Sequence, residues 1–277
     1  MKKEKEIPYS SFGTQGETIH FAHANAYPPE TYLSLLNALS ADFKIQAIHH
    51  RPLWPDAKIN EVNSWYQFSD DLIQFFDQQK LKNVHGFGHS LGAVASIIAA
   101  SERKDLFKSL FLIDPVLFGP SFKFVRYLPK ALIKQILPIA KLALKRKDQW
   151  KEEDELFESY REKAIFRRYA DRDIRQFFRG GTEFKDGLYH LRYTKEWEAH
   201  TYSTATYVLD RLKSINIPVT ILRASETDVI SHEIWMKLKT SSSNINCIDI
   251  DDASHLLPFE YPKEIALHLK KHIDVYS

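Results

Sequence analysis

Short apolar runs alternate with longer segments of helical spacing along most of this chain, and this rhythm constrains the fold most strongly. Apolar runs typical of strands occupy residues 18–22, 43–48, 84–87, 110–113, 219–222 and 245–250. Helical spacing occupies residues 30–39, 65–80, 91–101, 232–239 and 263–273. Strands that alternate with helices of this length predict βαβ units and a largely parallel sheet, so the expected fold class is α/β.

The alternation breaks between about Leu117 and Thr201, where helical patterns, aromatic residues and dense charge occur without a convincing strand. It resumes afterwards. The length of 277 residues is enough for one large α/β domain with an insertion. We therefore expect a core built from residues 1–117 and 202–277, with a helical cap or lid over residues 118–201.

Composition excludes several functional classes. The 38 basic and 36 acidic side chains give a net charge of +2, which argues against a nucleic-acid partner because such proteins carry a strong basic excess. The single cysteine, Cys247, excludes an intrachain disulfide framework and a Cys-based zinc site. No metal-binding cluster or nucleotide-binding loop is visible in the sequence, so we expect neither a metal nor a cofactor.

The N-terminal sequence predicts the compartment. The charged residues 1–6 precede no apolar signal segment, and no stretch of about 18 apolar residues follows anywhere in the chain. We therefore expect a cytoplasmic protein without a transmembrane helix.

A candidate nucleophile lies where a predicted strand meets a predicted helix. Gly88-His89-Ser90-Leu91-Gly92 matches the pattern G-x-S-x-G, and it stands between the strand at 84–87 and the alanine-rich helix at 91–101. A sharp turn at this place projects the serine hydroxyl above the sheet. Small residues on both sides let the strand and the helix approach closely. Ser90 is therefore the predicted nucleophile.

A serine hydroxyl is a weak nucleophile unless an adjacent base removes its proton. His255 follows the last predicted strand on a loop, at the carboxyl end where sites of α/β proteins are built. Chain order and position together favour His255 as the general base.

A third group should orient the imidazole and stabilise its positive charge. Asp228, which follows the strand at 219–222, is the favoured carboxylate because it gives the chain order Ser…Asp…His. Asp114, at the end of the strand at 110–113, is the alternative, and Glu226 is a third candidate. The residues alone leave this choice open.

The tetrahedral oxyanion of an acyl transfer needs backbone donors. The N–H of Leu91 follows the nucleophile, and the loop after the early strand at 18–22 supplies a second donor, which we assign to Asn25. For His23, in the same loop, a role in bracing the loop is favoured over catalysis.

Taken together, His23-Ala24-Asn25, the motif around Ser90, the segment that ends at Asp228 and Ser254-His255 resemble the α/β-hydrolase fold superfamily, closest to its capped esterase, haloperoxidase-like and dehalogenase-like branch. The resemblance implies a mostly parallel eight-stranded sheet flanked by helices, with a helical lid inserted after strand six. The family usually has His-Gly where this chain has His23-Ala24. Dehalogenases and related epoxide hydrolases use an aspartate nucleophile, so Ser90 argues against both activities.

The predicted lid begins with an amphipathic basic helix. Every charged residue between Ser121 and Lys147 is basic, and a kink is expected at Pro138. A lid helix packed on the core with a solvated lysine face is the favoured interpretation. An anionic membrane surface or a phosphate-bearing substrate such as an acyl-CoA would also suit this charge.

Aromatic residues crowd the second half of the lid and predict an apolar roof over the pocket. The predicted function is therefore a serine hydrolase that cleaves a carboxylic ester or thioester of a largely apolar small molecule through an acyl-enzyme. The alternatives are a protein of the same fold that binds a small ligand without turnover, and a lipid hydrolase that acts at a membrane surface through the basic lid.

Overall fold

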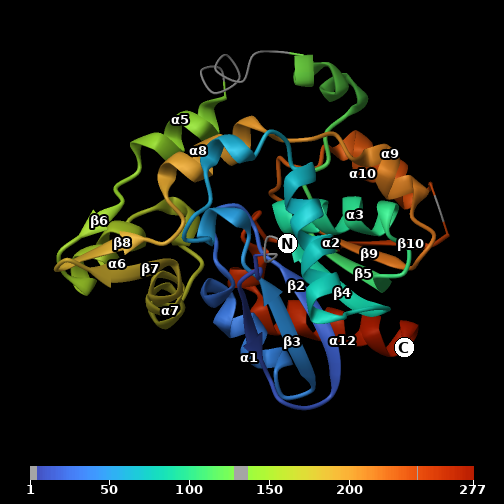
Figure 1. Ribbon diagram of the computed structural model, residues 1–277, viewed down its shortest axis with the longest axis horizontal. Helices are drawn as coiled ribbons and strands as arrows, with labels where there is room; N and C mark the ends of the chain where they lie inside the picture. The colour runs from blue at the N-terminus through green and yellow to red at the C-terminus, as the bar shows by residue number, and fades with distance from the viewer. Residues whose placement is uncertain (1–4, 128–136, 242) are drawn as a thin grey trace.

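A parallel sheet forms the centre of the protein (Figure 1). The computed structural model describes residues 5–127, 137–241 and 243–277. Within them the main sheet has seven strands in the order β1-β3-β2-β4-β5-β9-β10. Only β1 pairs antiparallel with its neighbour. The strands are β1 (Tyr9–Phe12), β2 (Glu17–Ala22), β3 (Phe43–Ile48), β4 (Val84–His89), β5 (Phe107–Ile113), β9 (Val219–Ala224) and β10 (Ile245–Ile250).

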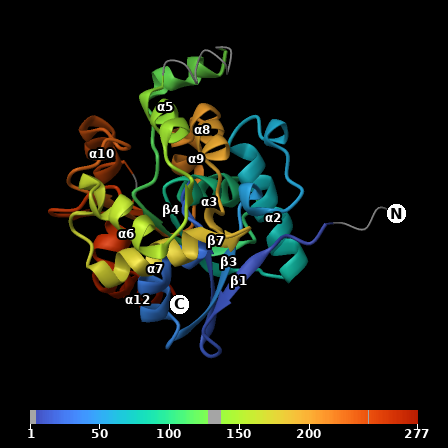
Figure 2. The ribbon, with the colours of Figure 1, turned by 90° about the vertical axis from the view of Figure 1, so that its left-hand side faces the viewer.

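Helices cover both faces of the sheet. One apolar cluster joins α2, α3, α9 and α10 to the sheet, and a second joins α1 and α12 to its opposite face. Figure 2 shows α12 and α2 on opposite sides of the strands. The helices of the core are η1 (Pro29–Tyr32), α1 (Leu33–Leu39), η2 (Arg51–Leu53), η3 (Ile59–Glu61), α2 (Tyr66–Gln79), α3 (Leu91–Glu102), α9 (Leu209–Ser214), α10 (His232–Lys239), α11 (Leu257–Glu260) and α12 (Pro262–Tyr276).

β4 lies at the centre of the main sheet, with three strands on each side. All six of its residues are buried, and α3 behind it buries every residue from Leu91 to Ala100. A strand of a parallel sheet that helices cover on both faces is buried along its whole length, as β4 is, even at His85 and His89. This burial fixes the turn between β4 and α3, which carries Ser90.

The predicted α/β class and parallel sheet are confirmed, but the expected number of strands is wrong. The described residues form seven strands in the main sheet rather than eight, so the inserted segment follows the fifth strand, β5. The short edge strand β1 was not predicted. Its sequence, Tyr-Ser-Ser-Phe, lacks the apolar alternation that marks a strand, because an edge strand is stabilised mainly by its pairing with β3.

We call residues 118–201 the inserted segment. Its elements are η4 (Pro120–Tyr127), α5 (Pro138–Lys145), β6 (Gln149–Trp150), α6 (Glu153–Arg161), η5 (Ala164–Phe166), α7 (Asp171–Gly181), β7 (Thr182–Lys185) and β8 (Leu188–Leu191), and α8 (Lys195–Ser203) crosses its end. The expectation of a purely helical segment is wrong, because β6, β8 and β7 form a small antiparallel sheet.

The hairpin between β7 and β8 has a local sequence signal, although it lies in the segment that was expected to be helical. Asp186 and Gly187 form its two-residue turn with φ angles of 53° and 77°. An Asp-Gly pair suits a tight hairpin turn because both central residues need a positive φ.

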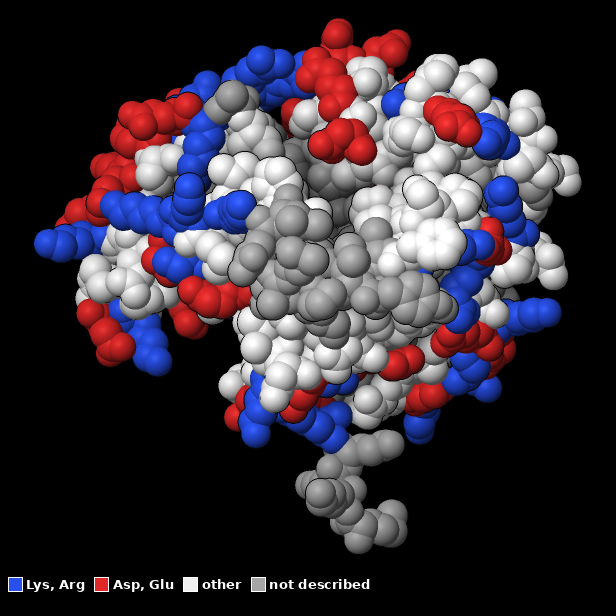
Figure 3. All heavy atoms as spheres, turned by 90° about the horizontal axis from the view of Figure 1, so that it is seen from above, with Lys and Arg blue, Asp and Glu red and all other residues white. Residues whose placement is uncertain are grey.

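The predicted basic helix over residues 121–147 is only partly described, since residues 128–136 lie outside the described residues. Pro138 does not kink a helix there but is the first residue of α5, where its missing N–H costs no hydrogen bond. Lys141, Leu142 and Lys145 are exposed. Seen from above, the coloured side chains of both charge signs are interspersed (Figure 3). Contact of this region with an anionic membrane stays a prediction.

In the part of the chain that the structure covers, no helix is both long enough and apolar enough to cross a lipid bilayer.

The aromatic residues of the inserted segment pack onto the core. Trp150, Phe157, Tyr160, Phe177 and Phe178 belong to the same buried cluster as α1 and α12. The inserted segment is thus joined to the core by apolar contact.

The packing of α7 on η1 yields a testable prediction. A Cβ atom added at Gly180 would lie 2.3 Å from the backbone carbonyl group of Glu30, whereas one added at Gly181 would meet only Thr31 Cγ2, at 3.4 Å. Gly180→Ala should therefore lower the free energy of unfolding by about 1–3 kcal/mol, the usual cost of overpacking. Gly181→Ala is the matched control and should cost less than about 0.5 kcal/mol. Thermal unfolding of both variants checks this, and equal effects would contradict it.

Candidate active site

The turn that carries Ser90 has an unusual backbone. Ser90 takes φ 54° and ψ −116° between β4 and α3. A positive φ is uncommon for a residue with a side chain, and such residues gather at functional sites. Gly92 makes the turn sterically feasible, because a Cβ atom there would lie 2.0 Å from the carbonyl oxygen of Ala22. The sequence motif thus has the strained strand-to-helix turn that it predicted.

His255 lies beside Ser90. It occupies the loop between β10 and α11, and its Nε2 atom is 3.0 Å from Ser90 Oγ. The imidazole is 28% exposed, whereas Ser90 is only 7% exposed. The structure therefore brings together the predicted nucleophile and the predicted base, although 165 positions separate them.

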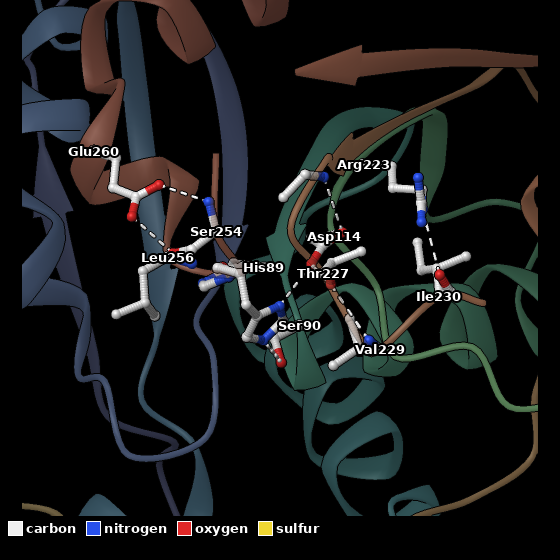
Figure 4. A network of polar contacts seen from close by, with 12 residues as sticks. His89, Ser90, Asp114, Arg223, Thr227, Val229, Ile230, Ser254, Leu256 and Glu260 are labelled. Carbon is white, nitrogen blue, oxygen red and sulfur yellow. Dashed lines mark hydrogen bonds and ion pairs between the residues drawn. The ribbon is translucent and has the colours of Figure 1, made fainter. Parts of the chain in front are cut away.

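Asp114 is the carboxylate that meets the imidazole. Its Oδ2 atom lies 2.7 Å from His255 Nδ1, and its side chain is fully buried. Two further donors reach the carboxylate: the Thr227 hydroxyl at 2.5 Å and the Ala224 backbone N–H at 3.2 Å. In Figure 4, Ser90, Asp114 and Thr227 point toward one place at the edge of the sheet.

Asp228, the acid that chain order favours, is not brought to the imidazole. It is exposed in the loop after β9, and that loop contributes Thr227 as a donor to Asp114 instead. Glu226, the third candidate, pairs with Arg168 at 2.6 Å. Chain order could not decide between the aspartates, because both stand between Ser90 and His255. The sheet order decides it, since β5 is the neighbour of β4 and delivers Asp114 next to the serine.

The residues predicted to bind the oxyanion, Leu91 and Asn25, lie in segments next to the turn at Ser90. In the pairing of β2 with β4, Ala22 lies opposite Gly88, so the loop that contains Asn25 leaves the sheet next to the turn at Ser90. Leu91 is the first residue of α3, where backbone N–H groups have no partner within the helix. Asn25 is buried, and its side-chain amide donates to the carbonyl oxygen of Glu198 at 3.2 Å.

Two buried histidines hold the Asn25 loop. The N–H of His50 donates to His23 Nε2 at 3.1 Å, and His50 Nε2 donates to the carbonyl oxygen of His23 at 3.0 Å. Burial, and secondarily His50, lower the pKa of His23 well below its ordinary value, so the ring is neutral and can accept this hydrogen bond. These contacts match the bracing role expected for His23.

His89, the residue before the nucleophile, connects three loops. Its Nε2 donates to the carbonyl oxygen of His255 at 2.9 Å, and its Nδ1 accepts from the Tyr32 hydroxyl at 2.8 Å. The same hydroxyl accepts from the N–H of Ala24 at 3.2 Å. Burial, followed by the charge of His255, lowers the pKa of His89 well below its ordinary value, which keeps this ring neutral. In the sequence, His89 is evident only as a variable residue of the motif around Ser90.

Glu260 fixes the loop on the other side of His255. Its buried carboxylate accepts from the backbone N–H of Ser254 at 2.8 Å and from the Ser254 hydroxyl at 2.7 Å. The hydroxyl in turn accepts from the N–H of Leu256 at 3.1 Å. Hydrogen bonds thus hold the residues on both sides of His255, Ser254 and Leu256, in place (Figure 4). A glutamate at the end of α11 gave no signal in the sequence.

Among the described residues, no group of three or more His, Cys, Asp or Glu side chains is placed so that it could hold a metal ion.

Comparisons with known proteins agree with this fold. Three similar solved structures cover almost the whole chain. An E-2-(acetamidomethylene)succinate hydrolase has a TM-score of 0.79 and 18% identity, over 97% of this chain and 95% of that one. A thioesterase domain from the curacin biosynthetic pathway has a TM-score of 0.73 and 14% identity, over 96% and 98%. A marine microorganism esterase has a TM-score of 0.66 and 18% identity, over 96% and 98%. At these identities the likeness shows the fold.

A curated relative matches a shorter segment. Ethanol acetyltransferase 1 from Hanseniaspora uvarum is 36% identical over 70 residues, which are 24% of this chain. The match spans about a fifth of that relative, 21% of its length.

A model of a protein family matches a much larger part of the chain than this relative does. The model for the alpha/beta hydrolase family matches residues 21–267, which include Ser90, Asp114 and His255. With the parallel sheet and the strained serine turn, this match settles the family: the chain belongs to the alpha/beta hydrolases.

Proposed function

We propose that this protein is a serine hydrolase that cleaves carboxylic esters or thioesters through Ser90, His255 and Asp114. The observation that carries the proposal is one continuous series of contacts. Ser90 Oγ lies 3.0 Å from one ring nitrogen of His255, and Asp114 lies 2.7 Å from the other. These distances are within the reach required of a nucleophile, its base and the group that orients the base.

In the first half of the reaction, Ser90 Oγ attacks the carbonyl carbon of the substrate while His255 Nε2 takes the hydroxyl proton. Asp114 accepts a hydrogen bond from His255 Nδ1 and stabilises the imidazolium that forms. The backbone N–H groups of Leu91 and Asn25 bind the oxyanion of the tetrahedral intermediate. His255 then gives its proton to the departing alcohol or thiol, which leaves the acyl group on Ser90.

In the second half, a water molecule loses a proton to His255 Nε2 and attacks the acyl-enzyme. Collapse of the second tetrahedral intermediate returns the proton to Ser90 Oγ and releases the acid. The hydrogen bonds that Thr227 and the N–H of Ala224 donate to Asp114 hold its carboxylate in place beside His255.

The names of similar proteins support the cleavage of an ester or thioester bond. They include an esterase, a thioesterase domain and an acetyltransferase, and all three names denote acyl transfer. The alternative of a ligand-binding protein without turnover gives no reason for a buried carboxylate, an imidazole and a hydroxyl to be aligned. We further propose that the inserted segment acts as a lid whose aromatic side chains line the substrate pocket.

The hydrolase proposal predicts covalent labelling at Ser90. A fluorophosphonate probe should form an adduct on Ser90 in the folded protein, because it reacts with serines that an adjacent base activates. Peptide mass mapping locates the adduct. Ser90→Ala should abolish labelling and reduce turnover of p-nitrophenyl esters by about 10⁴-fold or more. Ser225→Ala is the control, since that serine is exposed after β9 and its loss should leave the labelling of Ser90 intact. A folded wild-type protein without an adduct on Ser90 would refute the proposal.

The two aspartates give a second prediction. Asp114→Asn should lower kcat by about 10⁴-fold, because the amide can no longer stabilise the imidazolium and favours the wrong tautomer. Asp228→Asn removes the same charge from an exposed loop and should change kcat by less than about threefold. Circular dichroism confirms that both variants are folded before their kinetics are compared. The opposite ranking would restore Asp228 as the acid.

A further inference from the structure

A small cavity lies between the oxyanion loop and the inserted segment. Its volume is about 160 Å³. Ala26 and Tyr27 line it from the loop after β2, and Phe177 and Phe178 of α7 supply apolar walls. A cavity of about 150 Å³ in another protein binds benzene, so this space is large enough for part of a small substrate.

The cavity contains two cationic side chains, which is unusual for an apolar space. Arg146 and Lys163 both line it. Arg146 forms an ion pair with Glu198, at 2.9 Å between Nη2 and Oε2, and these side chains are only 19% and 10% exposed. Lys163 lies over the ring of Tyr160, with Nζ 4.1 Å from the ring centroid. In the described part of the chain, no carboxylate lies within ion-pair distance of Lys163 Nζ.

The charges of this cluster do not balance. Two cations and the one carboxylate of Glu198 leave one positive charge. The other titratable groups that act on Arg146 are the tyrosines Tyr27, Tyr160 and Tyr202, which are neutral at pH 7 because burial raises their pKa values. Burial, followed by the charge of Arg146, lowers the pKa of Lys163 to about 8. The excess charge falls on the half-buried Lys163, so an anion in the cavity would gain a favourable interaction with it.

Arg146 also has unused hydrogen-bonding capacity. Its Nε atom is buried and has no hydrogen-bond partner among the described residues. Guanidinium N–H groups form a planar fork that suits a carboxylate. The ion pair with Glu198 holds the guanidinium in place and leaves this donor for a ligand.

The cluster is connected to the reaction centre through Asn25. The side-chain amide of Asn25 donates to the carbonyl oxygen of Glu198, the residue that holds Arg146. Tyr27, which lines the cavity, is two residues beyond Asn25. Since consecutive Cα atoms are about 3.8 Å apart, the Cα atoms of Asn25 and Tyr27 are at most about 7.6 Å apart. The cavity therefore adjoins the loop that carries Asn25, the predicted second oxyanion donor.

We propose that Arg146 and Lys163 form a subsite for a carboxylate of the substrate, so that the preferred ester or thioester carries a carboxylate a few carbon atoms from the bond that is cleaved. The inference rests on the proposed function and adds the class of substrate to it. A carboxylate suits the site better than a phosphate, because one negative charge neutralises the excess whereas a dianion would leave a buried charge unpaired.

The test compares two substrates that differ in one charge. The mono-p-nitrophenyl ester of glutaric acid carries the carboxylate, and the p-nitrophenyl ester of glutaramic acid carries a neutral amide of the same size. Wild-type protein should prefer the charged ester by about 10- to 100-fold in kcat/KM, through a lower KM. The preference should decline above about pH 8 as Lys163 loses its proton. Equal kcat/KM values for the two esters would overturn the subsite.

Variants locate the charge that is responsible. Lys163→Met keeps most of the side chain and should bring the ratio of the two kcat/KM values close to one. Lys141→Met removes an exposed lysine of α5 and should leave the ratio at its wild-type value. Arg146→Gln is combined with Glu198→Gln so that no unpaired carboxylate remains, and it should also abolish the preference. Thermal unfolding confirms that each variant is folded. A folded Lys163→Met variant with the wild-type ratio would overturn the assignment.

Binding separates this inference from the proposed function. Glutaramate, the monoamide of glutarate, carries the carboxylate but no ester, and calorimetry measures its binding to wild type and to Lys163→Met. Binding that the substitution abolishes supports the subsite even if no ester is cleaved, in which case only the hydrolase proposal fails. Cleavage of neutral esters without glutaramate binding would instead refute the subsite and leave the hydrolase.

Discussion

The backbone at Ser90 is the constraint on which the site depends. A serine with φ 54° is strained, and it persists only where the surrounding structure leaves no alternative. Here β4 is buried along its whole length, and Gly92 brings α3 against the end of β2. The same close approach places the Asn25 loop beside the serine. The packing that strains the turn thus also positions the Asn25 loop.

Neutral histidines connect the loops around this turn. His23 and His50 hold the Asn25 loop, and His89 joins the Ser90 turn to the backbone of His255. Each of these three rings is buried, and burial is the main cause of its lowered pKa. A neutral imidazole can donate from one nitrogen and accept at the other, so it can link two backbones without a buried charge. His255 differs in being partly exposed and in having a carboxylate at one nitrogen.

The sequence predicts the parts of this site that depend on local pattern. Ser90 follows from the glycines around it, and His255 follows from its place after the last strand. The choice between Asp114 and Asp228 depends instead on which strand lies beside β4, and chain order contains no such information. Glu260 and Tyr32 escape prediction for a similar reason, since each acts through a loop that is distant in sequence. The hairpin at Asp186-Gly187 has a recognisable turn sequence, but the dense charge around it led to the prediction of a helical segment.

Polar contacts as well as apolar packing join the inserted segment to the core. Arg192 binds Glu30 at 2.6 Å, and Arg168 binds Glu226 at 2.6 Å in the loop that supplies Thr227. Both contacts are partly exposed pairs, which contribute little to stability because water screens their charges. The pair of Arg146 with Glu198 is more deeply buried and cannot be explained in the same way, since a buried ion pair rarely stabilises a protein more than apolar side chains would. Its position beside the Asn25 loop supports the proposed role of Arg146 in recognising substrate.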